Sequence, residues 1–224
     1  LHALMLSTVS LSVLLILCAF ICVSLGTART PVKVVIAGGG PAGLFAANAL
    51  LSRTGTNQDF HVHLVEAKED PRYAAVGPRS YWRGVNIRGQ NAFQYFEQQG
   101  RLTKLWSKVK QEGIESDSFF LHLGKFKLQI RKPSKENRKS GPPPTLLIPR
   151  NKLCTAMLEN LEEEYGSTGR FTAHFNTKIN EVDFQSCKVA IGGESANDVL
   201  AFDLLLGCDG VRSAVRKAIE QSRP

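Results

Sequence analysis

The glycine-rich stretch 38–43, GGGPAG, follows an apolar β-branched run at residues 32–36 and directly precedes a helix-like run. In a βαβ unit, this placement indicates a dinucleotide site. Gly38 permits the tight turn, Gly40 lets the backbone approach a pyrophosphate, and Gly43 allows the helix to pack closely on the strand. The N-terminus of the helix then faces the phosphate charge. The motif predicts a Rossmann-like α/β fold.

An acidic residue follows at the position where such a fold needs one. Glu66 closes a second expected strand at 60–65 and stands 28 residues after Gly38. A carboxylate there can accept hydrogen bonds from the ribose diol of an adenosine group. An exposed glutamate at a strand end is the alternative, but the glycine turn favours the ribose role.

The first part of the chain has the composition of a membrane segment. Residues 1–28 contain no Lys, Arg, Asp or Glu, and residues 9–25 are almost continuously apolar. This length suits the core of a signal peptide or a short transmembrane helix, and a buried helix of a soluble core is the less favoured alternative. We expect a hydrophobic helix at 1–30 that serves as signal or anchor. Residues 3–28 would then direct the protein to a membrane or to a secretory or organellar compartment.

The chain has 224 residues, which suffices for one domain but is short for separate cofactor and substrate lobes. It also starts on Leu1 rather than Met. We therefore expect an N-terminal fragment of a larger protein. Its residues 31–224 would form an incomplete dinucleotide-binding domain whose C-terminal part is missing.

The net charge of +8 comes from one segment, because residues 101–152 hold 13 Lys and Arg against 4 Asp and Glu. Such a segment can steer anions or membranes. Its densest part runs into SGPPP at 140–144, which favours a solvated loop. We expect no nucleic-acid partner, because the basic residues are not interleaved with aromatic side chains.

No metal site is expected. Cys154, Cys187 and Cys208 are scattered, and His61 and His63 alternate along one strand, where two unliganded imidazoles are the favoured interpretation.

The hydrophobic pattern predicts a βαβ start, an excursion, a helix, a small β meander and a returning strand. Expected helices span about 41–53, 89–99, 101–110, 150–165 and 213–220. Expected strands span 32–37, 60–65, 119–123, 126–130, 171–175, 178–184, 187–191, 198–202 and 202–206. A meander inserted into a parallel sheet is characteristic of large FAD-binding folds.

Several motifs together resemble the FAD-dependent aromatic monooxygenases, and among them the kynurenine 3-monooxygenases. The resemblance covers about residues 32–217. The most specific motif is GCDGVRSAVR at 207–216, which is similar to the family's second fingerprint. The other matching motifs are the glycine turn, EAKED at 66–70 followed by Arg72, Arg79-Ser80 spaced seven residues from Arg88-Gly89, and IPRNKL at 148–153.

The resemblance implies a set of FAD-binding residues and no catalytic acid, base or nucleophile. Gly38, Gly40, Pro41, Ala42 and Gly43 would line the pyrophosphate. Glu66, Ala67 and Lys68 would hold the adenosine ribose. The remaining expected FAD contacts are Gly84, Arg150, Ile179 and Asp209. Arg150 is the strongest charged candidate, because a planar guanidinium with several donors suits a phosphate.

Two departures limit the resemblance. The kynurenine enzymes place an arginine for the substrate carboxylate six residues after a Gly-Ile pair, whereas here Gly113-Ile114 leads to Phe119. We therefore expect a substrate other than kynurenine. The family's third motif, Gly-Asp-Ala near the flavin ribityl chain, and its substrate-binding sheet are absent from this sequence.

The resemblance implies a flavoprotein monooxygenase in which NAD(P)H reduces FAD and O₂ supplies an oxygen atom to a small aromatic substrate. Flavin epoxidases and reductases that act on isoprenoids share these motifs, and the apolar N-terminus suits them. The spacing from Arg79-Ser80 to Arg88-Gly89 favours the kynurenine-like branch. A third alternative is a membrane-tethered FAD-binding fragment without turnover.

Overall fold

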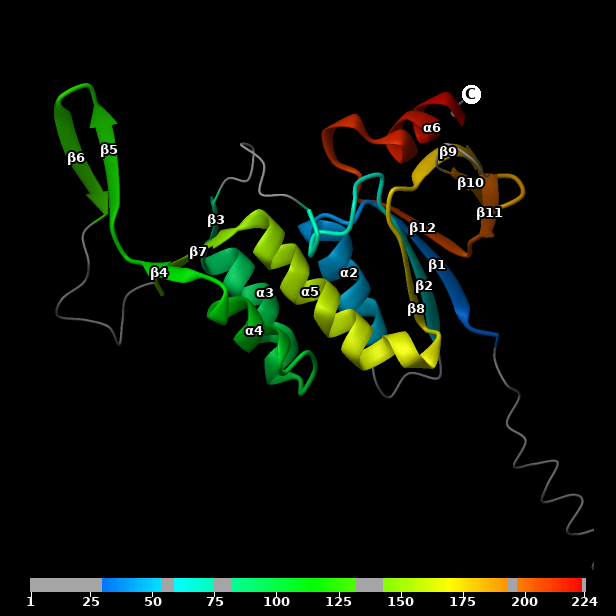
Figure 1. Cartoon of the computed structure of the whole chain (residues 1–224), viewed down its shortest axis with the longest axis horizontal. Helices are drawn as coiled ribbons and strands as arrows, with labels where there is room; N and C mark the ends of the chain where they lie inside the picture. The colour runs from blue at the N-terminus through cyan, green and yellow to red at the C-terminus, as the bar shows by residue number, and fades with distance from the viewer. Residues whose placement is uncertain (1–29, 54–58, 75–81, 132–142, 193–196, 223–224) are drawn as a thin grey trace, which may run out of the picture.

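The computed structural model describes residues 30–53, 59–74, 82–131, 143–192 and 197–222 (Figure 1). The hydrophobic helix expected at 1–30 lies outside them except for its last residue. Arg79-Ser80 and the part of the basic segment at 132–142 also lie outside the described residues. Among the described residues, no helix has both the length and the apolar character that a membrane crossing requires.

A parallel four-stranded sheet forms the centre of the molecule, with the strand order β12-β1-β2-β8. Its strands are β1 (Val32–Ala37), β2 (Phe60–Val65), β8 (Phe171–His174) and β12 (Leu204–Gly207). All three pairings are parallel, so the expected α/β fold is confirmed. The sequence pattern groups β8 with the meander. The structure instead pairs β8 with β2, because register in a sheet is decided by distant partners.

The inserted meander covers one face of this sheet (Figure 1). It consists of β9 (Lys178–Asp183), β10 (Lys188–Gly192) and β11 (Asn197–Ala201), which pair antiparallel. Val35 of β1 and Val65 of β2 pack against the meander in a small buried cluster. The other members of this cluster are Val189 and Ile191 of β10 and Phe202. The expected meander between β8 and β12 is therefore present.

Helices cover the opposite face of the sheet, where the main hydrophobic core lies (Figure 1). The helices on this side are α2 (Pro41–Leu51), α3 (Ile87–Gln98), α4 (Leu105–Gln111) and α5 (Arg150–Tyr165). A buried polar link joins α2 to α5, since Asn160 Nδ2 donates to Asn48 Oδ1 at 2.9 Å. Asn48 Nδ2 in turn donates to the carbonyl oxygens of Leu44 and Met157, at 2.8 and 3.0 Å. These bonds fix how the two helices pack.

Sequence patterns missed a second sheet and misplaced one helix start. The missed antiparallel sheet has the order β3-β7-β4, with β3 (Trp82–Val85), β4 (Ile114–Ser116) and β7 (Thr145–Pro149). Strands this short carry little alternation for a pattern to detect. Helix α4 begins at Leu105 rather than 101, because Leu102 adopts a left-handed backbone with φ of 51°.

Strands β5 (Phe119–Leu123) and β6 (Phe126–Arg131) form a hairpin that projects away from the rest of the molecule (Figure 1). Within the described residues, no other strand pairs with it. After β12 the chain makes a short turn and ends its described part in α6 (Ala214–Ser222).

Candidate dinucleotide-binding site

The first and last glycines of the predicted turn are required by packing. Gly38 has a φ of +102°, a conformation that L side chains rarely adopt. A Cβ added to Gly38 would lie 2.5 Å from the carbonyl oxygen of Cys208. A Cβ added to Gly43 would lie 2.0 Å from the carbonyl oxygen of Gly38. Gly43 therefore allows the close approach of α2 to β1 that the sequence predicted.

The N-terminus of α2 is open to an anion. Gly40 is its N-cap in an extended conformation, no side chain caps the helix, and its first turn contains no acidic residue. Pro41 lacks an N–H, so the amides of Ala42 and Gly43 are among the donors there. Because the helix dipole is positive at this end, the geometry favours a phosphate.

Arg150 brings a positive charge to the same turn. It begins α5, directly after β7, and its guanidinium approaches Gly40 so closely that an added Cβ would lie 3.1 Å from Nη2. A side chain at residue 40 would therefore displace the guanidinium. The glycine turn, the α2 N-terminus and Arg150 form one positively charged corner.

Glu66 lies beside this corner at the end of β2. Its Oε2 accepts a hydrogen bond from the Gly39 N–H at 2.7 Å, and its Oε1 accepts one from the Lys68 N–H at 2.9 Å. Both bonds hold the carboxylate at the carboxyl end of the sheet, and each oxygen keeps a lone pair for a further donor. Ala67 and the Lys68 side chain are exposed next to it.

The motif at 207–216 packs directly against the glycine turn. Asp209 Oδ2 accepts the N–H groups of Ala214 and Val215, at 2.6 and 3.3 Å, and so caps α6. Its second oxygen, Oδ1, is buried and has no hydrogen-bond partner among the described residues. A buried acceptor of this kind calls for a donor.

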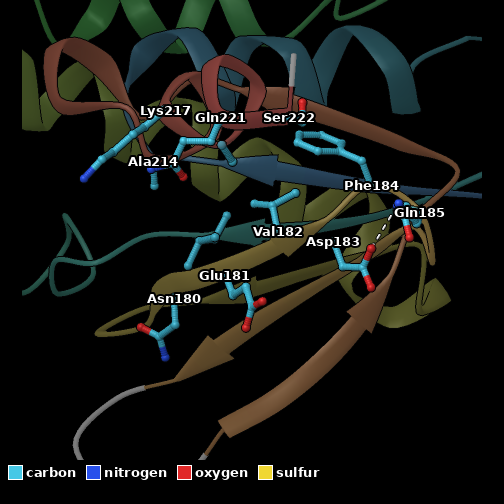
Figure 2. A pocket seen from close by; sticks show the side chains of 12 residues that line it. Asn180, Glu181, Val182, Asp183, Phe184, Gln185, Ala214, Lys217, Gln221 and Ser222 are labelled. Carbon is cyan, nitrogen blue, oxygen red and sulfur yellow. Dashed lines mark hydrogen bonds between the residues drawn. The ribbon is translucent and has the colours of Figure 1, made fainter. Parts of the chain in front are cut away.

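Two expected contacts lie elsewhere in the fold. Gly84 is on β3, where a Cβ would lie 3.1 Å from the Thr145 side chain, and it pairs with Leu147 of β7. Ile179 is on β9, half-buried against the core under the meander. It also lines an open cleft of about 620 Å³ between β9 and α6 (Figure 2). Among the described residues, no hydrogen bond or ion pair joins Gly84 or Ile179 to the glycine turn, so their role as FAD contacts stays a prediction.

Sequence reasoning missed two residues of the site. A Cβ on Gly39 would lie 2.9 Å from the Glu66 Cβ, so this glycine is what lets the ribose carboxylate come close. A Cβ on Gly207 would lie 3.2 Å from the Val215 side chain, where α6 packs on β12. Both glycines lie within recognised motifs, but only the tertiary contacts show what they do.

The buried Cys154 thiol lies close enough to Arg150 and Glu66 to be affected by their charges. Burial raises the pKa of the Cys154 thiol to about 11, although Arg150 lowers it and Glu66 raises it further. This thiol is therefore protonated at neutral pH. Among the described residues, no group of three or more His, Cys, Asp or Glu can hold a metal ion, and the cysteines are free.

His63 and His174 form a half-buried pair on β2 and β8. The His63 Nδ1 lies 3.1 Å from the His174 Nε2, and the rings stack with centroids 5.4 Å apart. Burial lowers the pKa of both imidazoles, and for His63 the charges of His174 and His61 lower it further. Asp198 acts in the opposite direction on His174. The pair joins two neighbouring strands of the sheet.

Relatives of known activity resemble most of this chain. A kynurenine 3-monooxygenase of Aspergillus clavatus is 30% identical over 207 residues, covering 85% of this chain and 38% of that protein. A kynurenine 3-monooxygenase of Stenotrophomonas maltophilia is 28% identical over 196 residues, covering 84% and 38%. The chain thus spans little more than a third of the length of the curated relatives that it matches.

A solved structure supports the fold. The flavin-dependent monooxygenase PieE, determined with FAD and substrate, matches with a TM-score of 0.62 at 21% identity, over 87% of this chain and 33% of that one.

The residues at the glycine turn fit FAD, because the uncapped helix end and Arg150 complement a pyrophosphate. The buried Asp209 Oδ1 also has no hydrogen-bond partner in the described part of the chain. The profile of one family, described as the FAD binding domain, matches residues 31–224. The chain belongs to this FAD binding domain family, with FAD as its cofactor.

Proposed function

We propose that this chain is the FAD-binding part of a flavoprotein monooxygenase that hydroxylates a small aromatic substrate with NAD(P)H and O₂. The observation that carries the proposal is the contact between the Arg150 guanidinium and Gly40 at the open N-terminus of α2. The similarity to kynurenine 3-monooxygenases supports the reaction class.

The residues of the site bind and orient the cofactor. The amides at the α2 N-terminus donate to the pyrophosphate, and Arg150 donates to it with its planar guanidinium. Glu66 accepts hydrogen bonds from the ribose hydroxyls while Gly39 and Lys68 hold it in place. FAD, when bound, supplies the redox and oxygen chemistry.

The two carboxylate oxygens of Asp209 have different roles in the proposed site. Its Oδ2 caps α6 through Ala214 and Val215, which fixes the end of β12 beside Gly38. Its buried Oδ1 accepts a donor of the bound cofactor. The carboxylate is therefore a binding and positioning group in this proposal.

The substrate that we propose is a small aromatic compound other than kynurenine. Phe119, which replaces the arginine expected for a kynurenine carboxylate, lies on β5 with 60% of its surface exposed. An exposed phenyl ring cannot pair with a carboxylate, so the substrate is held by other means. A screen of aromatic substrates for NAD(P)H-dependent oxygen consumption by a protein that contains this chain and the remainder of the enzyme tests this part.

Binding of FAD by this chain tests the central claim. Titration of the purified protein with FAD, followed by flavin fluorescence, should give saturable binding and a raised thermal midpoint. Arg150→Ala should weaken FAD binding by roughly 10- to 100-fold, because a charge-assisted hydrogen bond contributes about 1.5–3 kcal/mol.

A matched control lies on the same helix turn. Lys152 has the same charge and forms an exposed pair with Glu112 at 3.0 Å. Lys152→Ala should bind FAD as tightly as the parent chain. Equal losses in both variants, or no FAD binding by the parent chain, would contradict the proposed site.

We also propose that residues 3–28 tether the protein to a membrane or direct it to a secretory or organellar compartment. The absence of charged residues from 1–28 supports this proposal. Flotation of the expressed chain with vesicles, compared with a variant that lacks residues 1–30, tests it. Equal recovery of both in the soluble fraction would contradict it.

A further inference from the structure

Arg72 joins the loop after Glu66 to helix α5. Its backbone N–H and its Nε donate to the Asp70 carboxylate at 2.9 and 3.0 Å, and Nη2 also bonds Asp70 Oδ2. On its other edge, Nη1 bonds Glu162 Oε2, and Nη2 donates to Glu162 Oε1 at 3.1 Å. One guanidinium thus pairs bidentately with a carboxylate on the loop and with another on α5.

The joined elements both belong to the proposed FAD site. Residues 66–70 are the loop whose first residue is the ribose carboxylate, and α5 is the helix that begins with Arg150. The loop is also tied to the chain after β8, since the backbone carbonyl of Lys68 accepts the Asn176 N–H at 2.9 Å and that of Glu66 accepts the Thr177 N–H at 3.0 Å. Arg72 provides a connection from this loop to the helix that carries the phosphate arginine.

The contacts of Arg72 with Asp70 and Glu162 pair opposite charges, and the Asp70 and Arg72 side chains are partly buried. The Asp70 and Arg72 side chains are only 13% and 27% exposed. Burial would raise the pKa of the Asp70 carboxyl, but hydrogen bonds and charge from Arg72 outweigh it and hold this pKa below its ordinary value. The hydrogen bonds that Arg72 donates to Asp70, followed by those that it donates to Glu162, raise the pKa of Arg72. Asp70 and Arg72 are therefore both charged at neutral pH.

We infer that Arg72 is a positioning residue for cofactor binding: through Asp70 and Glu162 it holds the Glu66 loop against α5, so that the ribose carboxylate and Arg150 act on one bound FAD. The inference rests on the proposed function. Within the described part of the chain, Arg72 has no hydrogen bond or ion pair with Glu66 or with the glycine turn, so it acts through the loop. Ion pairs at a protein surface contribute little to stability, so its removal should change placement more than folding.

The first test compares two ion pairs on neighbouring residues of α5. Glu162 binds Arg72 of the loop, whereas Glu163 binds Lys108 of α4 at 2.6 Å. Arg72→Ala and Glu162→Gln should each weaken FAD binding roughly tenfold in a fluorescence titration, with little change in the thermal midpoint. Lys108→Ala and Glu163→Gln should leave the FAD affinity unchanged.

The second test asks whether Arg72 acts through Glu66. In a double-mutant cycle, Arg72→Ala should weaken FAD binding roughly tenfold in the parent chain and less than about twofold in a Glu66→Ala background. A purely structural role predicts the same fold loss in both backgrounds. Arg72→Lys should restore only part of the affinity, because an ammonium cannot pair bidentately with both carboxylates.

The outcomes separate this inference from the function on which it rests. If the parent chain binds no FAD, the proposed function fails. If the parent chain binds FAD and Arg72→Ala binds it equally well, or if Lys108→Ala loses as much affinity as Arg72→Ala, the positioning role of Arg72 is wrong while the FAD site stands.

Discussion

The glycine turn and the β5–β6 hairpin lie in two regions of the molecule with opposite packing (Figure 1). At the turn, backbone atoms of residues 208–209 and of Gly38 approach so closely that Gly38 and Gly43 admit no side chain. In the hairpin, apolar side chains stay exposed, with Phe126 at 81% and Leu123 at 60%. Nothing within the described residues covers them.

A function can be inferred from the contacts of the glycine turn but not from those of the β5–β6 hairpin. The turn is specified by contacts that are all present, so its binding chemistry can be derived residue by residue. An isolated two-stranded hairpin is marginal in water, and its apolar residues contribute little until something covers them. The proposed FAD site is therefore well defined, whereas Phe119 on the hairpin constrains the substrate only by excluding a carboxylate contact.

Within the turn, the largest expected effect is on stability, and it differs between Gly43 and Gly40. Gly43→Ala places a Cβ 2.0 Å from the Gly38 carbonyl oxygen, and we expect a loss of stability on the order of 3 kcal/mol in urea unfolding. In Gly40→Ala, the added Cβ would contact only the Arg150 guanidinium, at 3.1 Å from Nη2. It should keep its stability but bind FAD more weakly. Equal stability of the two variants would contradict the packing argument.

The next effect concerns the two caps of α6. Asp209→Ala removes an acceptor for two N–H groups, and Ser213→Ala removes the acceptor of the Arg216 N–H at 2.9 Å. Each should cost about 1 kcal/mol of unfolding free energy. Only Asp209→Ala should also weaken FAD binding in a fluorescence titration. A loss of affinity in both variants would show that α6, and not the carboxylate, matters.

A smaller effect is expected from pH, through His63 and His174. Because burial lowers both pKa values in the folded protein, the unfolded chain binds more protons below the ordinary value of 6.5. Stability should therefore fall as the pH drops through 6.5 toward the lowered values, and should be constant above it. Thermal midpoints from pH 8 to pH 5 measure this dependence, and it should flatten in a His63→Leu variant.

The smallest effect is expected in the hairpin. Phe126→Ser should change the unfolding free energy by less than about 0.5 kcal/mol, because the ring is 81% exposed. Phe93→Ala in the core, where the ring is 7% exposed, should cost about 3–5 kcal/mol. Light scattering should also show less self-association for Phe126→Ser. A large loss of stability in this variant would mean that the hairpin is packed in solution.

Elements with strong local signals were predictable from the sequence. The strands at β1 and β2, helix α5 and both hairpin strands match the expected ranges closely, because hydrophobic periodicity and glycine are local properties. The second sheet, with β3, β4 and β7, was missed because its strands are short. The placement of β8 in the main sheet depends on its pairing with β2 and was not visible in the sequence either.

The sequence by itself determined the strand, the glycine turn, the helix and the acidic residue that define a dinucleotide site, because backbone conformation and spacing act within a short stretch. Only the tertiary structure decided that Arg150 meets Gly40, that Cys208 and Asp209 pack on Gly38, and that Arg72 joins the Glu66 loop to Glu162. These contacts join residues far apart in the chain. They depend on how helices and strands pack around a common core, which no local pattern encodes.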